Sequence, residues 1–534
     1  MKALFTTAVL MVLLTSGIAT AQVGGDAGFD KIVAVEKLVR DCYADTISHD
    51  RLIEITIRSA FGYLDPHTVY KTRQEAEEEE KKYGAERTGI GAEAARLHDT
   101  LTILTVAAHT PAYKAGLRAG MQIDSINDIP VTNRILNDEQ MMKIINARED
   151  SIKLSLIRGK GRKVIVIPRY TIRNASVESY YMPNDSTAYI KIFKFNKYTG
   201  EDFEKILEEL GPKHLRNVII DLRDNPGGTL QVCAPICNQI IPANMVLFTT
   251  ARAYEESMPE FSNKDGFLKN SRIYILINEN SASASEVIAS CIQDNDRGVI
   301  IGRRSFGKAL TQQVSHLPDG SKVLISNGRI ISPSGRCIQK DYVRGNFAEY
   351  HNELGQRKLR REHICRDSIR TEGKPQHHTV MRHRIVYGHM GVVPDCFVPE
   401  DSTNAIPVHS IAEKNSLYDD MRFFALIFVD DHRARLRSAY GSFKSFCKSF
   451  YVSDGMVADF FQYRRNKAVS LRGTFESKTP SAVASHIHRQ IKAYVAKAMF
   501  GDNEFRRLLN EDDSDFLAAM RLVSDPKAYW DLLK

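Results

Sequence analysis

Residues 280–286 read Asn-Ser-Ala-Ser-Ala-Ser-Glu and join an apolar run to a segment with helical character. The apolar run, Ile273-Tyr-Ile-Leu-Ile277, is short and rich in isoleucine, which predicts a buried strand. The residues Glu286-Val-Ile-Ala-Ser-Cys-Ile-Gln293 predict a helix, so the three serines stand at a strand-to-helix turn. Free N–H groups of a first helical turn stabilise an anion, and this position therefore suits a nucleophile.

A second segment, Phe306-Gly-Lys-Ala-Leu-Thr-Gln312, offers a base for a serine hydroxyl. A hydroxyl needs such a base before it attacks a carbonyl group. A lysine serves only in its neutral form, which requires desolvation or nearby positive charge to lower its pKa, and Lys308 has apolar neighbours. The simpler interpretation is that the small residues let a helix pack closely on a sheet and that Lys308 is a solvated surface charge.

Together the two segments resemble the C-terminal-processing (tail-specific) serine proteases. The resemblance rests on Ser-Ala-Ser-Ala-Ser-Glu, on a following Gln-Asp pair, and on Phe-Gly-Lys with a glutamine four residues after the lysine. It implies that Ser283 is the catalytic nucleophile, that Lys308 is the general base and that Gln312 orients the lysine. Asp294 of the Gln-Asp pair is expected to give structural support. The resemblance also implies a ClpP/crotonase-like α/β protease core of layered sheet and helices, without a metal or an organic cofactor.

Length and composition indicate an ordinary globular protein of several domains. The chain has 534 residues, of which 43% are hydrophobic and 26% charged, so about three or four domains are expected. The net charge of +8 is spread along the chain apart from the cluster Arg357-Lys-Leu-Arg-Arg361. Because no motif for base stacking or groove reading accompanies it, nucleic-acid binding is not expected.

Residues 1–21 have the pattern of a secretory signal peptide. Lys2 precedes the apolar segment Ala8-Val-Leu-Met-Val-Leu-Leu14, and Ala19-Thr-Ala21 places small residues before a cleavage point at Gln22. The apolar segment is too short for a permanent anchor, and no later stretch is expected to cross a membrane. We therefore expect export, and the usual bacterial setting of the family favours the periplasm.

The eight cysteines are sparse for a chain of this length. Cys233 and Cys237 are separated by three residues, so they form neither a CxxC redox motif nor half of a zinc site. We expect mostly buried, small apolar side chains with at most one disulfide.

The N-terminal part, residues 22–85, is predicted to be helical because apolar residues such as Ile32, Val35 and Leu38 recur at helical spacing. A turn at Leu64-Asp-Pro-His-Thr-Val-Tyr70 interrupts it and resembles a segment that precedes the binding domain in the family. His67 of this turn is expected to be a hydrogen-bonded structural residue, since no acid or nucleophile motif lies near it in the sequence.

Residues 86–172 alternate like short strands and resemble a PDZ domain inserted ahead of the core. Four runs, at 101–106, 123–126, 152–157 and 163–167, predict strands, and Thr110-Pro-Ala-Tyr-Lys-Ala-Gly-Leu117 predicts a helix. The resemblance makes Thr88-Gly-Ile-Gly-Ala92 the loop that binds a peptide's terminal carboxylate, with Gly89, Ile90 and Gly91 as the substrate-tail residues. Backbone N–H groups in such a loop can cradle a carboxylate while the peptide adds a strand.

Residues 173–400 alternate strands and helices and are predicted to form the Ser/Lys protease core. The strand Asn217-Val-Ile-Ile-Asp-Leu222 runs into the tight turn Arg223-Asp-Asn-Pro-Gly-Gly228, at the strand end where open α/β sheets place their sites. The resemblance implies an oxyanion hole made by the N–H of Ala284 and that of Gly227 or Gly228. The sequence leaves the choice between the two glycines open.

The end of this core is less regular. Strands are expected at 322–326 and 329–332, and residues 341–382 are expected to be a polar, irregular insertion or strap on the surface, because they show no apolar period. His389 interrupts a glycine-rich return segment and is not expected to be catalytic, since the Ser/Lys pair leaves no proton-transfer role vacant.

Residues 401–534 are predicted to form a helical C-terminal domain that packs on the core or on a second protomer. Phe443, Phe446 and Phe450 share one helical face, and the run at 483, 487, 491 and 495 shares another, opened by Thr479-Pro480 and closed by Gly501. The resemblance becomes thin in this part of the chain.

These observations predict an exported serine endopeptidase that cleaves polypeptides with free C-termini near those termini, with a homo-oligomer or an adaptor protein as further partners. One alternative is a non-catalytic periplasmic scaffold that binds peptides through its PDZ domain. A Ser-His-Asp hydrolase that uses one of the 16 histidines is the other.

Overall fold

The structure is a computed structural model that describes residues 27–97, 100–107, 109–132, 140, 150–158, 161–253, 255–401, 411–468 and 481–534. The predicted signal peptide and Thr479-Pro480 lie outside the described residues. The chain divides into two compact units, residues 1–61 and 62–534. The first contains helices α1 (Ala27–Cys42) and α2 (His49–Phe61), as the helical spacing predicts, and Ile32, Val35 and Leu38 are exposed on α1.

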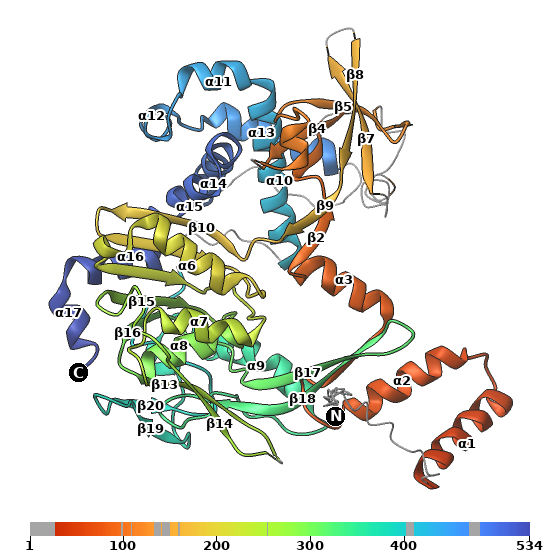
Figure 1. Ribbon diagram of the computed structural model, residues 1–534, viewed down its shortest axis with the longest axis vertical. Helices are drawn as coiled ribbons and strands as arrows, with labels where there is room; N and C mark the ends of the chain where they lie inside the picture. Colours follow the sequence, from red (N-terminus) through yellow and green to blue (C-terminus); the bar gives the residue numbers. More distant parts are fainter. Residues whose placement is uncertain are drawn as a thin grey trace, which may run out of the picture. The chain divides into compact units, whose positions relative to one another are not determined.

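The second unit is built around a six-stranded sheet (Figure 1). Its order is β10-β11-β12-β15-β16-β21, and the pair β10–β11 is antiparallel whereas the other strands run parallel. The strands are β10 (Val177–Asn184), β11 (Thr187–Ile192), β12 (Asn217–Asp221), β15 (Arg272–Ile277), β16 (Gly298–Gly302) and β21 (Cys396–Phe397). The predicted strands at 217–222 and 273–277 are the two central ones.

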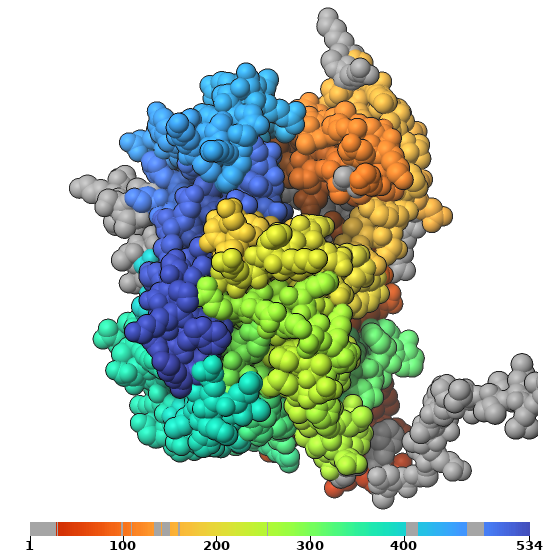
Figure 2. Space-filling view, turned by 60° about the vertical axis from the view of Figure 1, so that its left-hand side comes forward, coloured from red at the N-terminus to blue at the C-terminus, as the bar shows by residue number. Residues whose placement is uncertain are grey.

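Alternate residues of each central strand point to opposite faces of the sheet, and both faces are buried. One face packs against α6 (Thr199–Leu210), α7 (Cys233–Asn238) and α8 (Ala284–Asp294) through residues such as Ile220 and Ile275. The other packs against α16 (Ser514–Ser524) and α17 (Pro526–Asp531) through residues such as Ile219 and Tyr274. The core is therefore a layered α/β structure whose second helical layer comes from the C-terminal region, seen in deep blue along the yellow-to-green core in Figure 2.

A second, antiparallel sheet combines strands that come before and after α8 in the chain. It contains β1 (Val69–Lys71), β18 (Lys322–Ile331), β13 (Val246–Ala251) and β14 (Met258–Phe261) in that order, and β17 (Leu310–His316) also pairs with β18. The two strands expected at 322–326 and 329–332 are thus one continuous strand. Asn327 and Gly328 do not break it, because Gly328 faces Thr311 of β17 and stays in the ladder.

Residues 86–173 form an antiparallel module joined to the core by α3 (Arg73–Tyr83). Its sheet has the order β3-β4-β5-β7-β8, with β6 (Ile129–Pro130) on β5, and β2 (Glu86–Gly89) pairs with β9 (Tyr170–Arg173). The strands are β3 (Ala92–Leu97), β4 (Thr100–Val106), β5 (Gln122–Ile126), β7 (Ser151–Arg158) and β8 (Gly161–Pro168). The four predicted runs correspond to β4, β5, β7 and β8, whereas β3 was not predicted. The expected helix is shorter, α4 (Pro111–Lys114), because Thr110 caps it and Gly116 leaves the helical region with φ 86°.

The expectation that residues 341–382 are irregular is wrong, although most of the segment lies on the surface as expected. The segment contains α9 (Phe347–Leu359), η3 (Arg366–Ser368) and β19 (Gln376–His378), which pairs with β20 (Ile385–Tyr387). Helix α9 buries Tyr350 and Arg357 against the core. Its buried side chains are polar, which explains why no apolar period marks this helix in the sequence.

The C-terminal region is helical, as predicted. It comprises α10 (Ile411–Asp431), α11 (Arg433–Ala439), α12 (Phe443–Ser449), α13 (Asp454–Ala468), α14 (Ser481–Phe500) and α15 (Asp502–Asn510), followed by α16 and α17. Phe446, Phe450, Ile487 and Ile491 are buried together in one cluster, so the two predicted apolar faces meet in a core.

All eight cysteines are free thiols, so the structure contains no disulfide at these positions. Cys233, Cys237 and Cys291 are buried, as expected for small apolar side chains. Within the described residues, no helix has the length and apolar composition needed to cross a membrane.

Candidate active site

The three serines of residues 280–286 differ in what their hydroxyls do. Ser281 Oγ donates to the carbonyl of Leu222 at 2.8 Å, and Ser285 Oγ donates to that of Asn225 at 3.0 Å. Both side chains are buried. They hold residues 280–286, called the serine turn below, to the turn at residues 222–228 that follows β12. Ser283, the middle one, is partly exposed and lines a cavity. Two serines are therefore structural, and Ser283 is the one that lines the cavity.

Ser283 occupies a strained backbone position immediately before α8. Its φ of 56° and ψ of −118° lie outside the backbone regions that residues other than glycine normally adopt. Such a conformation costs roughly 1–3 kcal/mol and is found at functional turns where the surrounding structure enforces it. The turn lifts Ser283 out of the strand and aligns it with the N-terminus of α8.

The side chain of Glu286 connects the serine turn to the lysine segment. Its Oε2 accepts hydrogen bonds from the N–H groups of Ser283 (2.9 Å) and Lys308 (2.8 Å). Its Oε1 accepts from the N–H of Gly307 (2.6 Å) and from the hydroxyl of Ser305 (2.5 Å). Burial raises the pKa of Glu286, and the hydrogen bonds from these four donors oppose that rise. One buried carboxylate thus fixes the backbone of Ser283 relative to that of Lys308.

Lys308 lies in the same cavity as Ser283, and its Nζ donates to Oε1 of Gln312 at 2.9 Å. None of the hydrogen bonds among the described residues joins Nζ to Ser283. Burial lowers the pKa of Lys308, an effect that Glu286 opposes and Lys71 reinforces. The environment therefore favours the neutral amine more than bulk water does.

Gln312 is itself held by the turn that contains His67. Its Nε2 donates to the carbonyl of His67 at 2.6 Å, and the imidazole Nε2 of His67 is hydrogen-bonded to the hydroxyl of Tyr350 at 2.7 Å. Burial, followed by the charge of Lys308, lowers the pKa of His67 to about 3, so this imidazole is neutral. The expectation of a hydrogen-bonded histidine is confirmed, but His67 lies beside the site, which its place in the sequence did not indicate.

The glycine turn after β12 lies directly against Ser283. A β-carbon on Gly227 would stand 2.6 Å from that of Ser283 and 3.0 Å from the nitrogen of Ala284, so no side chain fits there. The N–H of Gly227 donates to Oδ1 of Asn225 at 2.9 Å. Among the described hydrogen bonds, none uses the N–H of Gly228 or of Ala284. These two amides are the donors left for a ligand beside Ser283.

Arg223 anchors this glycine turn from the far side. Its guanidinium pairs with Asp221 at 2.6 Å and reaches Asp513 at 2.7 Å and Asp515 at 2.9 Å. Lys191 also pairs with Asp221, at 3.2 Å, in the same buried network. The N-terminus of α16, with Asp513 just before it and Asp515 in its first turn, therefore braces the turn that carries Gly227 and Gly228.

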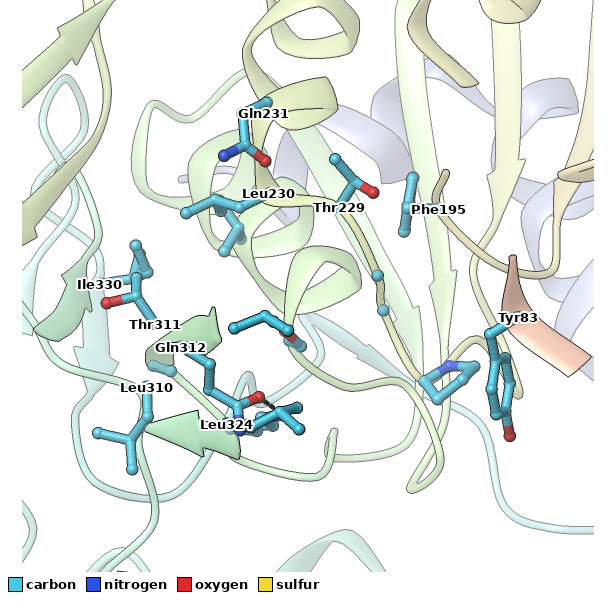
Figure 3. A pocket seen from close by; sticks show the side chains of 18 of the residues that line it. Tyr83, Phe195, Thr229, Leu230, Gln231, Leu310, Thr311, Gln312, Leu324 and Ile330 are labelled. Carbon is cyan, nitrogen blue, oxygen red and sulfur yellow. Dashed lines mark hydrogen bonds between the residues drawn. The ribbon is translucent and has the colours of Figure 1, made fainter. Parts of the chain in front are cut away.

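The cavity has a volume of about 800 Å³ and brings together Ser283, Lys308, Gln312, Gly227 and Gly228. Figure 3 shows Tyr83 and Phe195 on one side of it and Leu310, Thr311 and Gln312 of β17 on the other. The carboxylate-loop residues Gly89, Ile90 and Gly91 do not line this cavity. Gly89 ends β2, and Ile90 and Gly91 lie between β2 and β3, where their carbonyls accept from Ala112 and Ala107.

Two other expectations concern residues outside the cavity. Asp294 pairs with Arg336 at 2.7 Å and accepts from the hydroxyl of Ser334 at 2.6 Å, which is structural support. His389 is half-exposed and pairs with Asp341 at 2.9 Å. Among the described residues, no group of three or more histidine, cysteine or acidic side chains could hold a metal ion.

Sequence reasoning missed the roles of Glu286, His67 and Tyr350. Glu286 belongs to the quoted motif, and a capping glutamate three residues after a serine was a usable signal for it. Tyr350 comes from a helix that was not predicted, so no local pattern could have assigned it.

Comparison with protein-family models gives two matches. Residues 186–348 match peptidase family S41, and residues 412–501 match a family of unknown function, DUF8443. The first match contains the glycine turn, the serine turn and the lysine segment. The second covers most of the helices from α10 to α14.

The curated relatives with similar sequences include two bacterial proteases. Carboxy-terminal processing protease CtpB of Bacillus subtilis is 28% identical over 343 residues, which cover 62% of this chain and 70% of the relative. A probable CtpA-like serine protease of Staphylococcus epidermidis is 27% identical over 321 residues, which cover 60% of this chain and 65% of the relative.

Among solved structures, the photosystem II D1 C-terminal processing protease is 20% identical with a TM-score of 0.34, covering 69% of this chain and 92% of that one. A putative S41 protease from Bacteroides fragilis is 15% identical with a TM-score of 0.34, covering 57% and 86%.

Proposed function

We propose that the chain is a serine endopeptidase that cleaves polypeptides near their C-termini, because residues 186–348 match the model of peptidase family S41 and the chain is similar to C-terminal processing proteases. The observation that carries the proposal is the cavity in which Ser283 and Lys308 meet, with Lys308 Nζ held by Gln312 at 2.9 Å. A neutral amine and a serine hydroxyl in one partly buried cavity are suited to acyl transfer.

In the proposed reaction, Ser283 Oγ attacks the carbonyl carbon of the scissile peptide bond. Lys308 Nζ takes the hydroxyl proton as the new C–O bond forms. The carbonyl oxygen becomes an oxyanion, which accepts hydrogen bonds from the N–H groups of Ala284 and Gly228. Each such donor contributes roughly 3–4 kcal/mol to transition-state stabilisation. Of the two candidate glycines, Gly228 is preferred because the N–H of Gly227 already donates to Asn225.

The intermediate collapses when the C–N bond breaks and the lysine returns the proton to the leaving amine. Water then attacks the acyl-enzyme, again with Lys308 as the base, and releases the carboxylic acid and the serine. Gln312 is a positioning residue in this scheme, because it accepts from Nζ on one side and donates to the His67 carbonyl on the other.

The module at residues 86–173 is proposed to be a PDZ domain that captures the substrate's tail, with Gly89, Ile90 and Gly91 as its carboxylate loop. Gly91 has a φ of 83°, which suits a loop whose N–H groups turn toward an anion. The core is proposed to be of the ClpP/crotonase-like type. Export to the periplasm through a signal peptide at residues 1–21 completes the proposal.

The test is cleavage of an unfolded polypeptide by purified protein and by the variants Ser283→Ala and Lys308→Met. Both variants should lose cleavage while keeping the native unfolding transition. Lys213→Met is a matched control, because Lys213 is an exposed lysine of the same domain outside the cavity. Turnover that persists in either cavity variant would refute the Ser/Lys mechanism. Binding of polypeptide without any cleavage by the unaltered protein would favour the peptide-binding scaffold instead.

A further inference from the structure

Lys194 is a lysine of the cavity that the proposed mechanism does not use. It follows β11, is 8% exposed and lines the cavity that contains Ser283. The described residues supply no hydrogen bond or ion pair to its Nζ, and its one aromatic contact is with the ring of Phe193, at 5.7 Å. An ammonium that faces a cavity without a protein acceptor is available to an anionic ligand, so such a group marks a place where an anion can bind.

The other cations that line this cavity already have partners. Lys322 pairs with Glu79, Lys308 donates to Gln312, and Arg252 pairs with Glu255. Lys194 is therefore the cavity cation that is left for a ligand, within the part of the chain that the structure describes.

The backbone next to Lys194 is bonded to the glycine turn. The N–H of Phe195 donates to the carbonyl of Gly227 at 2.9 Å, and the carbonyl of Phe195 accepts from Thr229 at 3.1 Å. Lys194 thus stands one residue from the strand segment that holds the turn beside Ser283. In Figure 3, Phe195 and Thr229 mark this side of the cavity, opposite β17.

The charges near Lys194 include a competing acid. Burial lowers the pKa of Lys194, and Glu80 of α3, which also lines the cavity, opposes this effect. Among the described residues, Glu80 and Lys194 form no ion pair. The carboxylate of Glu80 attracts Lys194 and repels an incoming anion, so the two side chains should affect anion binding in opposite directions.

We propose that Lys194 is a specificity-determining residue that binds a carboxylate of the substrate inside the active-site cavity. The carboxylate is either the α-carboxylate of a short C-terminal fragment or an Asp or Glu side chain near the scissile bond. This inference rests on the proposed function, and it concerns a contact in the core that is separate from tail capture by residues 86–173.

The experiment compares cleavage of short peptides, of about eight residues, that share one scissile sequence. One pair differs only in a free or amidated C-terminus, and a second series replaces Asp by Asn at each position flanking the scissile bond. The unaltered protein should prefer the anionic member of one pair by about tenfold in kcat/KM, the effect of one charge-assisted hydrogen bond. Lys194→Met should abolish this preference while cleaving the neutral peptides at nearly the unaltered rate, and Lys194→Arg should retain it.

Two further variants make the test sharper. Glu80→Gln should increase the preference for the anionic peptide, and Lys194→Glu should reverse it in favour of a peptide with lysine at the same position. Lys213→Met, which removes an exposed lysine outside the cavity, is the charge-matched control. The set of peptides that Lys194→Met no longer distinguishes identifies the source of the carboxylate. That set is either the pair with a free or amidated C-terminus or the Asp and Asn series. A Lys194→Met variant that discriminates as the unaltered protein does in both series overturns the proposal.

Failure of this inference can be told apart from failure of the proposed function. Peptide affinities are also measured by fluorescence anisotropy with Ser283→Ala, which holds substrate without cutting it. If the unaltered protein cuts no peptide but Ser283→Ala still favours anionic peptides in a Lys194-dependent way, the protease function is wrong and the carboxylate site stands. If peptides are cut and neither assay depends on Lys194, the protease function stands and the carboxylate site is wrong.

Discussion

Replacing Glu286 by glutamine and by alanine should weaken the core to different extents. In the protein, each carboxylate oxygen accepts from two donors: Oε2 from Ser283 and Lys308, and Oε1 from Gly307 and Ser305. A glutamine has one oxygen, which can keep the two backbone donors of Ser283 and Lys308. Its amide nitrogen then faces the hydroxyl of Ser305, which can rotate and accept, and the N–H of Gly307, which cannot.

The magnitude follows from the number of donors left without an acceptor. Glu286→Gln leaves the N–H of Gly307 unsatisfied, which costs about 1–3 kcal/mol. Glu286→Ala leaves three backbone N–H groups and a hydroxyl facing a cavity, so the loss should exceed about 3 kcal/mol even if water enters. Because the glutamine keeps the alignment of Ser283 with Lys308, it should retain measurable peptide cleavage, whereas the alanine variant should retain none.

Trp530 makes the stability measurement simple. It is the single tryptophan of the chain and lies on α17, which packs on the central sheet. Its fluorescence during denaturant unfolding reports the core apart from the other parts of the chain. The reasoning would be refuted if the alanine variant unfolded within about 1 kcal/mol of the unaltered protein, or if the two variants were equally destabilised.

Three more predictions follow from the site. Ser281→Ala and Ser285→Ala should each lower stability by about 1–2 kcal/mol and keep cleavage, and the opposite pattern in the Trp530 unfolding and peptide assays would make one of them the nucleophile. Because burial lowers the pKa of Lys308, kcat/KM should rise with pH to a plateau reached below the ordinary lysine value of 10.5, and a midpoint at that value would contradict a desolvated base. The pKa of His67 falls from 6.5 to about 3 on folding, so the unfolded state binds more protons between these values and stability should be lost as the pH falls through that window. His67→Gln should flatten this part of the stability profile measured by Trp530 fluorescence, and an unchanged profile would mean that another group is responsible.

Much of the framework around the serine turn follows from local sequence patterns. The isoleucine-rich run before residue 280 predicts β15, the segment after it predicts α8, and Pro226 with two glycines predicts the turn after β12. Each signal is local, because strand composition, capping and turn residues act within a few positions. The strand at 217–222 can likewise be predicted from neighbouring residues alone, because its apolar composition indicates burial on both faces.

What the sequence did not reveal depends on contacts between distant residues. Tyr350 hydrogen-bonds to His67 283 residues away, and it lies on a helix whose buried residues are polar and leave no apolar stripe. The carboxylate of Glu286 acts on a segment about twenty residues later, which only the folded chain brings close. The continuous β18 was divided in the prediction because Asn327-Gly328 reads locally as a turn, and pairing with β17 overrides that preference.

The ion pairs of Arg223 carry a consequence for how the protein matures. Its acceptors Asp513 and Asp515 are 290 and 292 residues further along the chain. During translation, the guanidinium of Arg223 can pair only with Asp221 until the ribosome has synthesised Asp513 and Asp515. A nascent chain that stops short of Asp513 therefore lacks the clamp on its glycine turn. Synthesis itself thus delays assembly of the site, and prematurely terminated products should be poor catalysts.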